Sequence, residues 1–72
     1  MSDTIRVQAV WDDEAAVWVA TSADVPGLVT EADTLELLVD KLPGMICDLV
    51  EPAPIDTPLI IESRRETVIA AC

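Results

Sequence analysis

The sequence contains no histidine and only two cysteines, Cys47 and Cys72. A nucleophile such as Thr21, Ser22 or Cys47 needs an activating base, and the common acyl-transfer triads use histidine for it. A structural zinc site takes about four Cys or His ligands, more than the chain offers. We therefore predict no catalytic residue, no metal ligand and no cofactor.

Basic residues are also scarce: four stand against fourteen acidic ones, for a formal charge of −10. Nucleic-acid binding rests largely on Lys and Arg neutralising phosphates, and anionic membranes need the same charge. Direct binding to DNA, RNA or a membrane surface is therefore not expected. A basic protein partner would suit the chain, although acidic charge also simply keeps a small apolar protein in solution.

Long apolar runs are missing, and none approaches the roughly 20 residues that span a bilayer. The first four residues, Met-Ser-Asp-Thr, lack the basic and apolar regions of a secretory signal. The two cysteines form no motif, so we expect a reduced, cytoplasmic setting.

Seventy-two residues predict one domain, residues 1–72. A chain this short buries only about 60% of its unfolded surface, and burial against another chain is one remedy. With zinc excluded and one disulfide at most, we expect a homodimer or higher oligomer.

Alternating apolar residues predict a half-buried strand over residues 5–11 and a second strand over residues 17–21. The charged residues 12–14 between them are typical of a solvated turn, so the two strands form an antiparallel hairpin. A five-residue loop, residues 12–16, would pair Trp11 with Val17 and Ala9 with Val19. Because side chains alternate, a slip of one residue would exchange the faces of the second strand.

The rest of the chain predicts a turn at residues 22–27, a third strand at residues 28–31, a helix and a last strand at residues 57–64. Asp33 or Thr34 caps the helix, and Glu36 lies where a capping box needs it. Apolar spacing continues in phase across Pro43, which predicts one kinked helix ending near Glu51, with a break as the alternative. Residues 65–72 are a tail that we expect to prolong the last strand or to form a short fifth one. In one arrangement this fifth strand pairs with a second copy of the chain in a dimer.

The predicted order β-β-β-α-β is an α+β fold of two layers, with one mostly antiparallel sheet and one helix on one face. The favoured register turns Val10, Trp18 and Ala20 toward the uncovered face. An exposed tryptophan there is a candidate interface anchor. If Trp18 instead lies flat over Arg6 or Gln8, or if the register slips, that residue is not available to a partner.

Residues 17–30 contain a D-x-P-G turn at Asp24, Pro26 and Gly27, and Asp33, Thr34 and Glu36 form a D-T-x-E element. These two stretches resemble the HicB-like antitoxin family. Residues 11–20 read W-D-x-E-A-x-V-W-V-A, as in a short subgroup of uncharacterised proteins similar to HicB. The resemblance covers residues 5–49, and the last strand matches more loosely.

The resemblance implies a partial ribonuclease H-like fold that binds and neutralises a small basic RNase toxin of the HicA type. Family members commonly form dimers or higher oligomers, and many carry a C-terminal DNA-binding segment. Only eleven residues follow Ile61, so the DNA-binding half of that function is not expected. A stand-alone oligomeric domain with a structural or regulatory role, and no toxin, is the second hypothesis.

A third hypothesis is a metal-dependent nuclease, because ribonuclease H-like enzymes hold two Mg²⁺ ions with clustered carboxylates. Asp12, Asp13 and Glu14 are such a cluster in sequence. Catalysis needs acids that converge from several strands, whereas these three belong to one turn. A solvated turn is the interpretation we favour.

Overall fold

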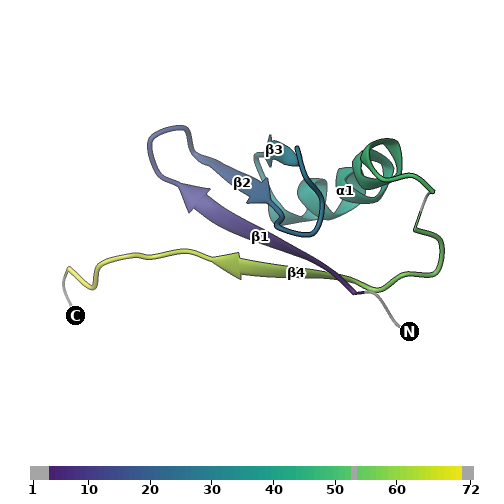
Figure 1. The fold of residues 1–72 in the computed structure, drawn as a ribbon. Helices are drawn as coiled ribbons and strands as arrows, with labels where there is room; N and C mark the ends of the chain where they lie inside the picture. The colour runs from purple at the N-terminus through teal and green to yellow at the C-terminus, as the bar shows by residue number, and fades with distance from the viewer. Residues whose placement is uncertain (1–3, 53, 71–72) are drawn as a thin grey trace.

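The structure is a computed structural model that describes residues 4–52 and 54–70, so Cys72 and the end of the tail lie outside it. Its elements follow the predicted order and confirm the α+β class (Figure 1). They are β1 (Ile5–Asp12), β2 (Val17–Thr21), β3 (Val29–Ala32), α1 (Leu35–Leu49) and β4 (Leu59–Arg64).

The four strands form one mixed sheet in the order β3-β2-β1-β4. The hairpin strands β1 and β2 are antiparallel, as are β2 and β3, whereas β4 runs parallel to β1. β3 and β4 run in the same direction at opposite edges of the sheet. The chain therefore needs a long crossover between them rather than a tight turn, and the helix is that crossover. This arrangement makes β3 and β4 the two edges of the sheet.

The helix begins after Thr34, whose Oγ1 accepts a hydrogen bond from the backbone N–H of Leu37 at 3.1 Å. Thr34, rather than Asp33, is therefore the N-cap. The helix is unbroken through Pro43 and ends at Leu49, two residues before the predicted end. The prediction of one helix across Pro43 is confirmed.

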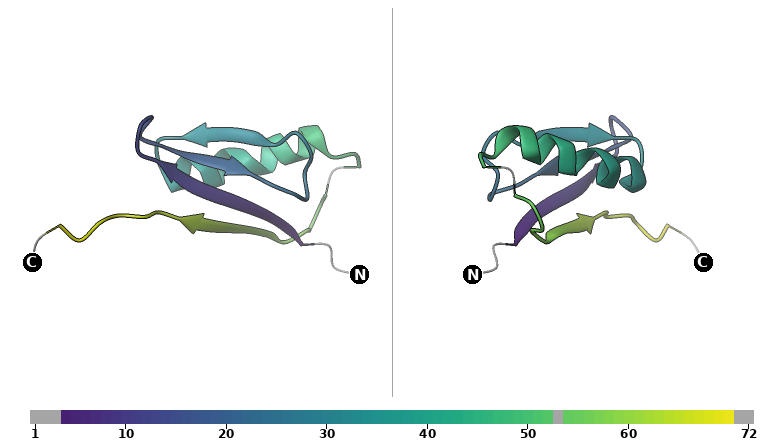
Figure 2. Two further views of the ribbon diagram at one scale, coloured as in Figure 1. Left: turned by 60° about the vertical axis from the view of Figure 1, so that its left-hand side comes forward. Right: turned by 90° about the vertical axis from the view of Figure 1, so that its right-hand side faces the viewer.

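The hydrophobic core lies between the helix and one face of the sheet (Figure 2). Ala9 and Ala20, which are fully buried and directly opposite each other, are small enough for the helix to approach that face closely. The core residues are Val7, Ala9, Ala20, Val25, Leu28, Leu38, Leu42 and Ile46.

The hairpin register differs by one residue from the predicted one. Trp11 pairs with Trp18 and Asp12 pairs with Val17, so the loop has four residues, 13–16. Asp12 Oδ1 accepts the backbone N–H groups of Glu14 and Ala15 at 3.0 and 3.3 Å, and Ala16 has a left-handed φ of 56°. This capped turn fixes the register, and it reverses the faces expected for β2.

Beyond β4 the chain continues as an extended tail, residues 65–70, which projects from the body of the molecule (Figure 1). The tail pairs with no strand among the described residues, so it neither prolongs β4 nor forms a fifth strand within this chain. Its projection contributes to the elongated extents of 50 × 23 × 19 Å.

Candidate functional site

The three residues predicted to form an interface do not share a face of the sheet. Val10 points outward and is 48% exposed, whereas Ala20 is fully buried in the core. Trp18 is partly buried against that core, and its ring lies edge-on to Trp11 with centroids 5.4 Å apart. The placement of Trp18 and Ala20 on the open face was therefore wrong, because the hairpin is shifted by one residue.

The face of the sheet opposite the helix is left uncovered by the elements described, as Figure 2 shows. We call this surface the outer face. The register places on it Arg6, Gln8, Val10 and Asp12 of β1, Val17, Val19 and Thr21 of β2, Val29 and Glu31 of β3, and Ile60, Glu62 and Arg64 of β4.

One row across the outer face has an apolar centre between opposite charges. Val10 lies directly opposite Val19, while Glu31 pairs with Val19 on one side and Arg64 pairs with Val10 on the other. An apolar centre within a polar rim is the usual anatomy of a protein-binding surface.

Further apolar side chains extend this surface. Val29 and Ile60 are both exposed, and Ile60 pairs with Arg6, whose guanidinium is 3.9 Å from the Glu62 carboxylate. Sequence reasoning did not assign Val17, Val19, Val29 or Ile60 to the interface. The alternation in β2 places Val17 and Val19 on one face, but the register of the hairpin is what makes this the outer face.

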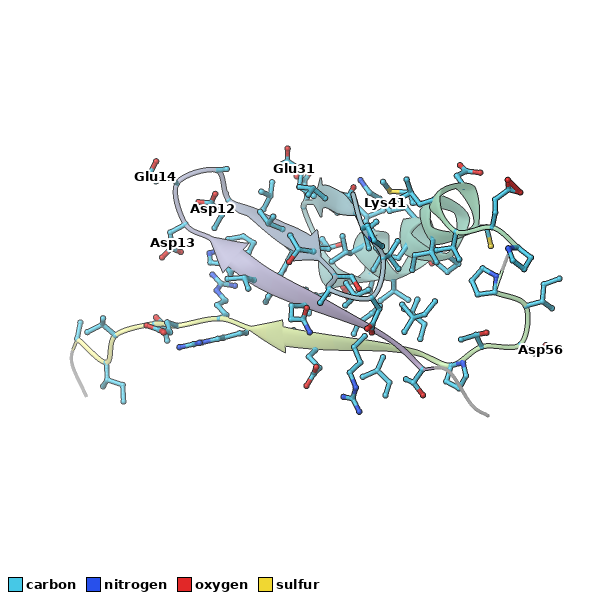
Figure 3. The ribbon with its side chains drawn as sticks, in the orientation of Figure 1. Asp12, Asp13, Glu14, Glu31, Lys41 and Asp56 are labelled. Atoms are coloured by element: carbon cyan, nitrogen blue, oxygen red, sulfur yellow. The ribbon has the colours of Figure 1, made fainter. Side chains whose placement is uncertain are left out.

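The carboxylates of Asp12 and Asp13 at the hairpin tip accept hydrogen bonds from neighbouring residues of the hairpin (Figure 3). Asp12 accepts the two loop N–H groups, and Asp13 Oδ1 accepts a hydrogen bond from Trp11 Nε1 at 2.6 Å. Glu14 is exposed beside them. Within residues 4–52 and 54–70 no group of three or more Cys, Asp or Glu is arranged to hold a metal ion.

The D-x-P-G turn is likewise held by internal hydrogen bonds. Ser22 Oγ donates to the carbonyl of Arg6 at 2.6 Å and accepts the N–H of Asp24 at 3.1 Å. Asp24 Oδ2 accepts the N–H of Arg6 at 2.9 Å, and Gly27 takes a φ of 86° that favours glycine. These groups fasten the loop to the start of β1, which is a structural role.

Cys47 lies exposed on the helix, beside a depression of about 150 Å³ that Ile5 and Leu59 also line. As for membranes, the helix in the described part of the chain lacks the length and apolar character needed to cross one.

Comparison with known proteins gives two matches. The sequence matches the family described as "Domain of unknown function (DUF1902)" over residues 4–68. The fold matches the crystal structure of a hypothetical protein, TTHA1013, from the extremely thermophilic bacterium Thermus thermophilus. The TM-score is 0.70 and the identity 44%, over 96% of this chain and 100% of that one. Among the curated proteins none matches. The chain belongs to the DUF1902 family.

Proposed function

We propose that this chain is a non-catalytic, cytoplasmic protein-binding domain of the HicB antitoxin type, which neutralises a small basic RNase toxin similar to HicA. The observation that carries the proposal is the outer face, where exposed Val10, Val29 and Ile60 lie among charged residues. Water-exposed apolar side chains gathered on one face of a sheet are typical of a binding surface.

The charge of the chain supports a basic partner. Its net charge of −10 produces a negative potential that attracts a positively charged protein and speeds the encounter. An RNase that binds RNA through Lys and Arg presents such a surface. Binding of this domain would mask that surface, so neutralisation requires no chemistry from the antitoxin.

The partner can be sought by co-expression. A small basic protein encoded beside this chain should co-purify with it as a stable complex, and the affinity should fall as salt is raised because charges contribute to the contact. Added back to the purified RNase, the chain should stop RNA cleavage near one equivalent per toxin. Absence of a neighbouring basic reading frame, or failure of the two proteins to co-purify, would contradict the proposal.

The alternative function is a stand-alone oligomeric domain with no toxin. The exposed apolar tail favours it, since a second copy of the chain would be enough to cover Val68 and Ile69. One experiment with the basic neighbour distinguishes the two functions. An antitoxin binds and inhibits the basic neighbour, whereas a stand-alone domain forms its oligomer and leaves RNA cleavage unchanged.

A further inference from the structure

We propose that the β4 edge and the tail form an interface with a second copy of this chain. The two β4 strands, each extended by residues 65–70, pair antiparallel around a two-fold axis at Arg65. The two sheets then join into one of eight strands. This self-association does not depend on the basic partner, so the two proposals stand or fall separately.

Among residues 4–52 and 54–70 no strand pairs with the outer edge of β4, whereas the β3 edge is short and partly covered. Lys41 Nζ donates to the backbone carbonyl of Glu31 in β3 at 2.6 Å (Figure 3). On the other side, the N–H of Ile5 donates to the carbonyl of Pro58 at 3.0 Å. Successive residues of a strand point their backbone groups to opposite sides, so even-numbered positions face β1. Leu59, Ile61 and Ser63 therefore present N–H and C=O groups to the open edge, where another strand can pair.

The tail continues this edge in an extended conformation. Its sequence, Thr67-Val68-Ile69, is rich in β-branched residues, which favour strands. Val68 and Ile69 are each 84% exposed. Covering a large apolar side chain with another surface is stabilising. Because consecutive strand residues point to opposite faces, Val68 and Ile69 would be covered on different faces of the joined sheet.

The pattern of residues selects the register. With Arg65 on the axis, Arg64 lies opposite Glu66 of the second copy, and Ile61 lies opposite its Ile69. An axis at Arg64 would set the two Arg64 side chains opposite each other, and an axis at Glu66 would set the two Glu66 carboxylates opposite each other. Both arrangements pair like charges, which is unfavourable. An axis at Ser63 would set Ile61 against Arg65. The axis at Ser63 also pairs opposite charges, Glu62 with Arg64, and the axis at Arg65 sets Glu62 opposite Val68. The axis at Arg65 is nevertheless the one that combines opposite charges with an apolar pair.

Arg65 itself can occupy the axis because its charge is directed away from it. Its guanidinium carbon lies 4.2 Å from the centroid of the Trp11 ring in the same chain. Each guanidinium therefore stacks on its own tryptophan, a favourable cation–π contact. The two Arg65 charges are thus held apart even though their backbones are paired.

Cysteine probes test the axis directly. In a full-length chain with Cys47→Ala and Cys72→Ala, Arg65→Cys should cross-link to its own copy under mild oxidation, because the paired Cα atoms lie within disulfide reach. Ser63→Cys should not, since Ser63 pairs with Thr67 and the two Ser63 positions are then about 13 Å apart. A mixture of Ser63→Cys and Thr67→Cys chains should cross-link as a heterodimer.

Sedimentation of the unmodified chain supplies the second test. The mass should be twice the 7.7 kDa of one chain or a multiple of that. Ile69→Asp should shift it toward the monomer, while Leu37→Asp, at a position 52% exposed on the helix, should leave it unchanged. Neither residue is in the core, so both variants keep the fold.

Three results would each overturn the proposal. They are a monomeric mass throughout a millimolar concentration series, cross-linking of Ser63→Cys as fast as that of Arg65→Cys, and an Ile69→Asp variant that dimerises as well as Leu37→Asp.

Discussion

At the residue scale, Trp18 shows how a single position changes meaning with the register. On the predicted register it anchored an interface, whereas in the structure it packs against the core and contacts Trp11 edge-on. An aromatic side chain in that position contributes buried area and a favourable ring contact. Its contribution is therefore to the stability of the fold rather than to a partner's binding.

Trp18→Ser should accordingly lower the free energy of unfolding by about 2 kcal/mol, less than a fully buried tryptophan because the ring is only partly covered. The oligomeric mass should stay the same at concentrations where the chain remains folded. Val10→Ser is the matched control on the outer face and should change stability by no more than about 0.5 kcal/mol. Urea unfolding and sedimentation measure both quantities. A Trp18→Ser chain that keeps its stability but loses its oligomeric mass would restore the original interpretation.

At the element scale, β2 could be located from sequence but its faces could not. Val17, Trp18, Val19 and Ala20 are all apolar, so alternation alone does not say which pair is buried. Two local features decide it, the Asp12 side chain that caps the turn and the left-handed conformation of Ala16. Alanine rarely adopts that conformation, so no residue type in the loop predicted it. The helix, with its long periodic stripe, was predicted almost to its ends.

The helix start offers a prediction at the same scale. Thr34→Ala should destabilise the protein by about 1 kcal/mol, because the N–H of Leu37 loses its acceptor. Asp33→Ala, one residue earlier, should change stability by no more than about 0.5 kcal/mol. Thermal or urea unfolding of the two variants distinguishes the caps. A larger loss at Asp33 would mean that the helix begins one residue sooner than in the structure.

At the scale of the whole molecule, the order of the elements and the two-layer class followed from periodicity and turn residues. The existence of an open sheet face also followed, since one helix cannot cover both faces. Its composition did not, because Val17 and Val19 reach the outer face through the register of the hairpin. Strand propensity alone did not decide whether residues 65–70 pair with another strand of the chain, and in the structure they pair with none of the described strands.

The acidic residues of the whole molecule allow a test of the nuclease hypothesis. Asp12 and Asp13 already accept hydrogen bonds in the hairpin turn, so millimolar Mg²⁺ or Mn²⁺ should leave the melting temperature unchanged. A ligand that binds the folded state raises that temperature, by more as its concentration exceeds its dissociation constant. A clear rise, removed by Asp12→Asn and Asp13→Asn, would show a metal site and contradict the account.

The central claim is that the outer face binds a basic protein. It is tested most directly by titrating the basic neighbour against two matched variants, Val10→Asp and Leu37→Asp, at positions 48% and 52% exposed, the first on the outer face and the second on α1. Both add the same charge, so only the place of the change differs. Val10→Asp should weaken binding about tenfold or more, because it replaces an apolar contact at the centre of the face with a carboxylate that must lose its water, which costs more than about 1.4 kcal/mol even beside Arg64, and Leu37→Asp should bind like the unmodified chain. Equal affinity for the two variants, or loss with Leu37→Asp alone, would contradict the claim.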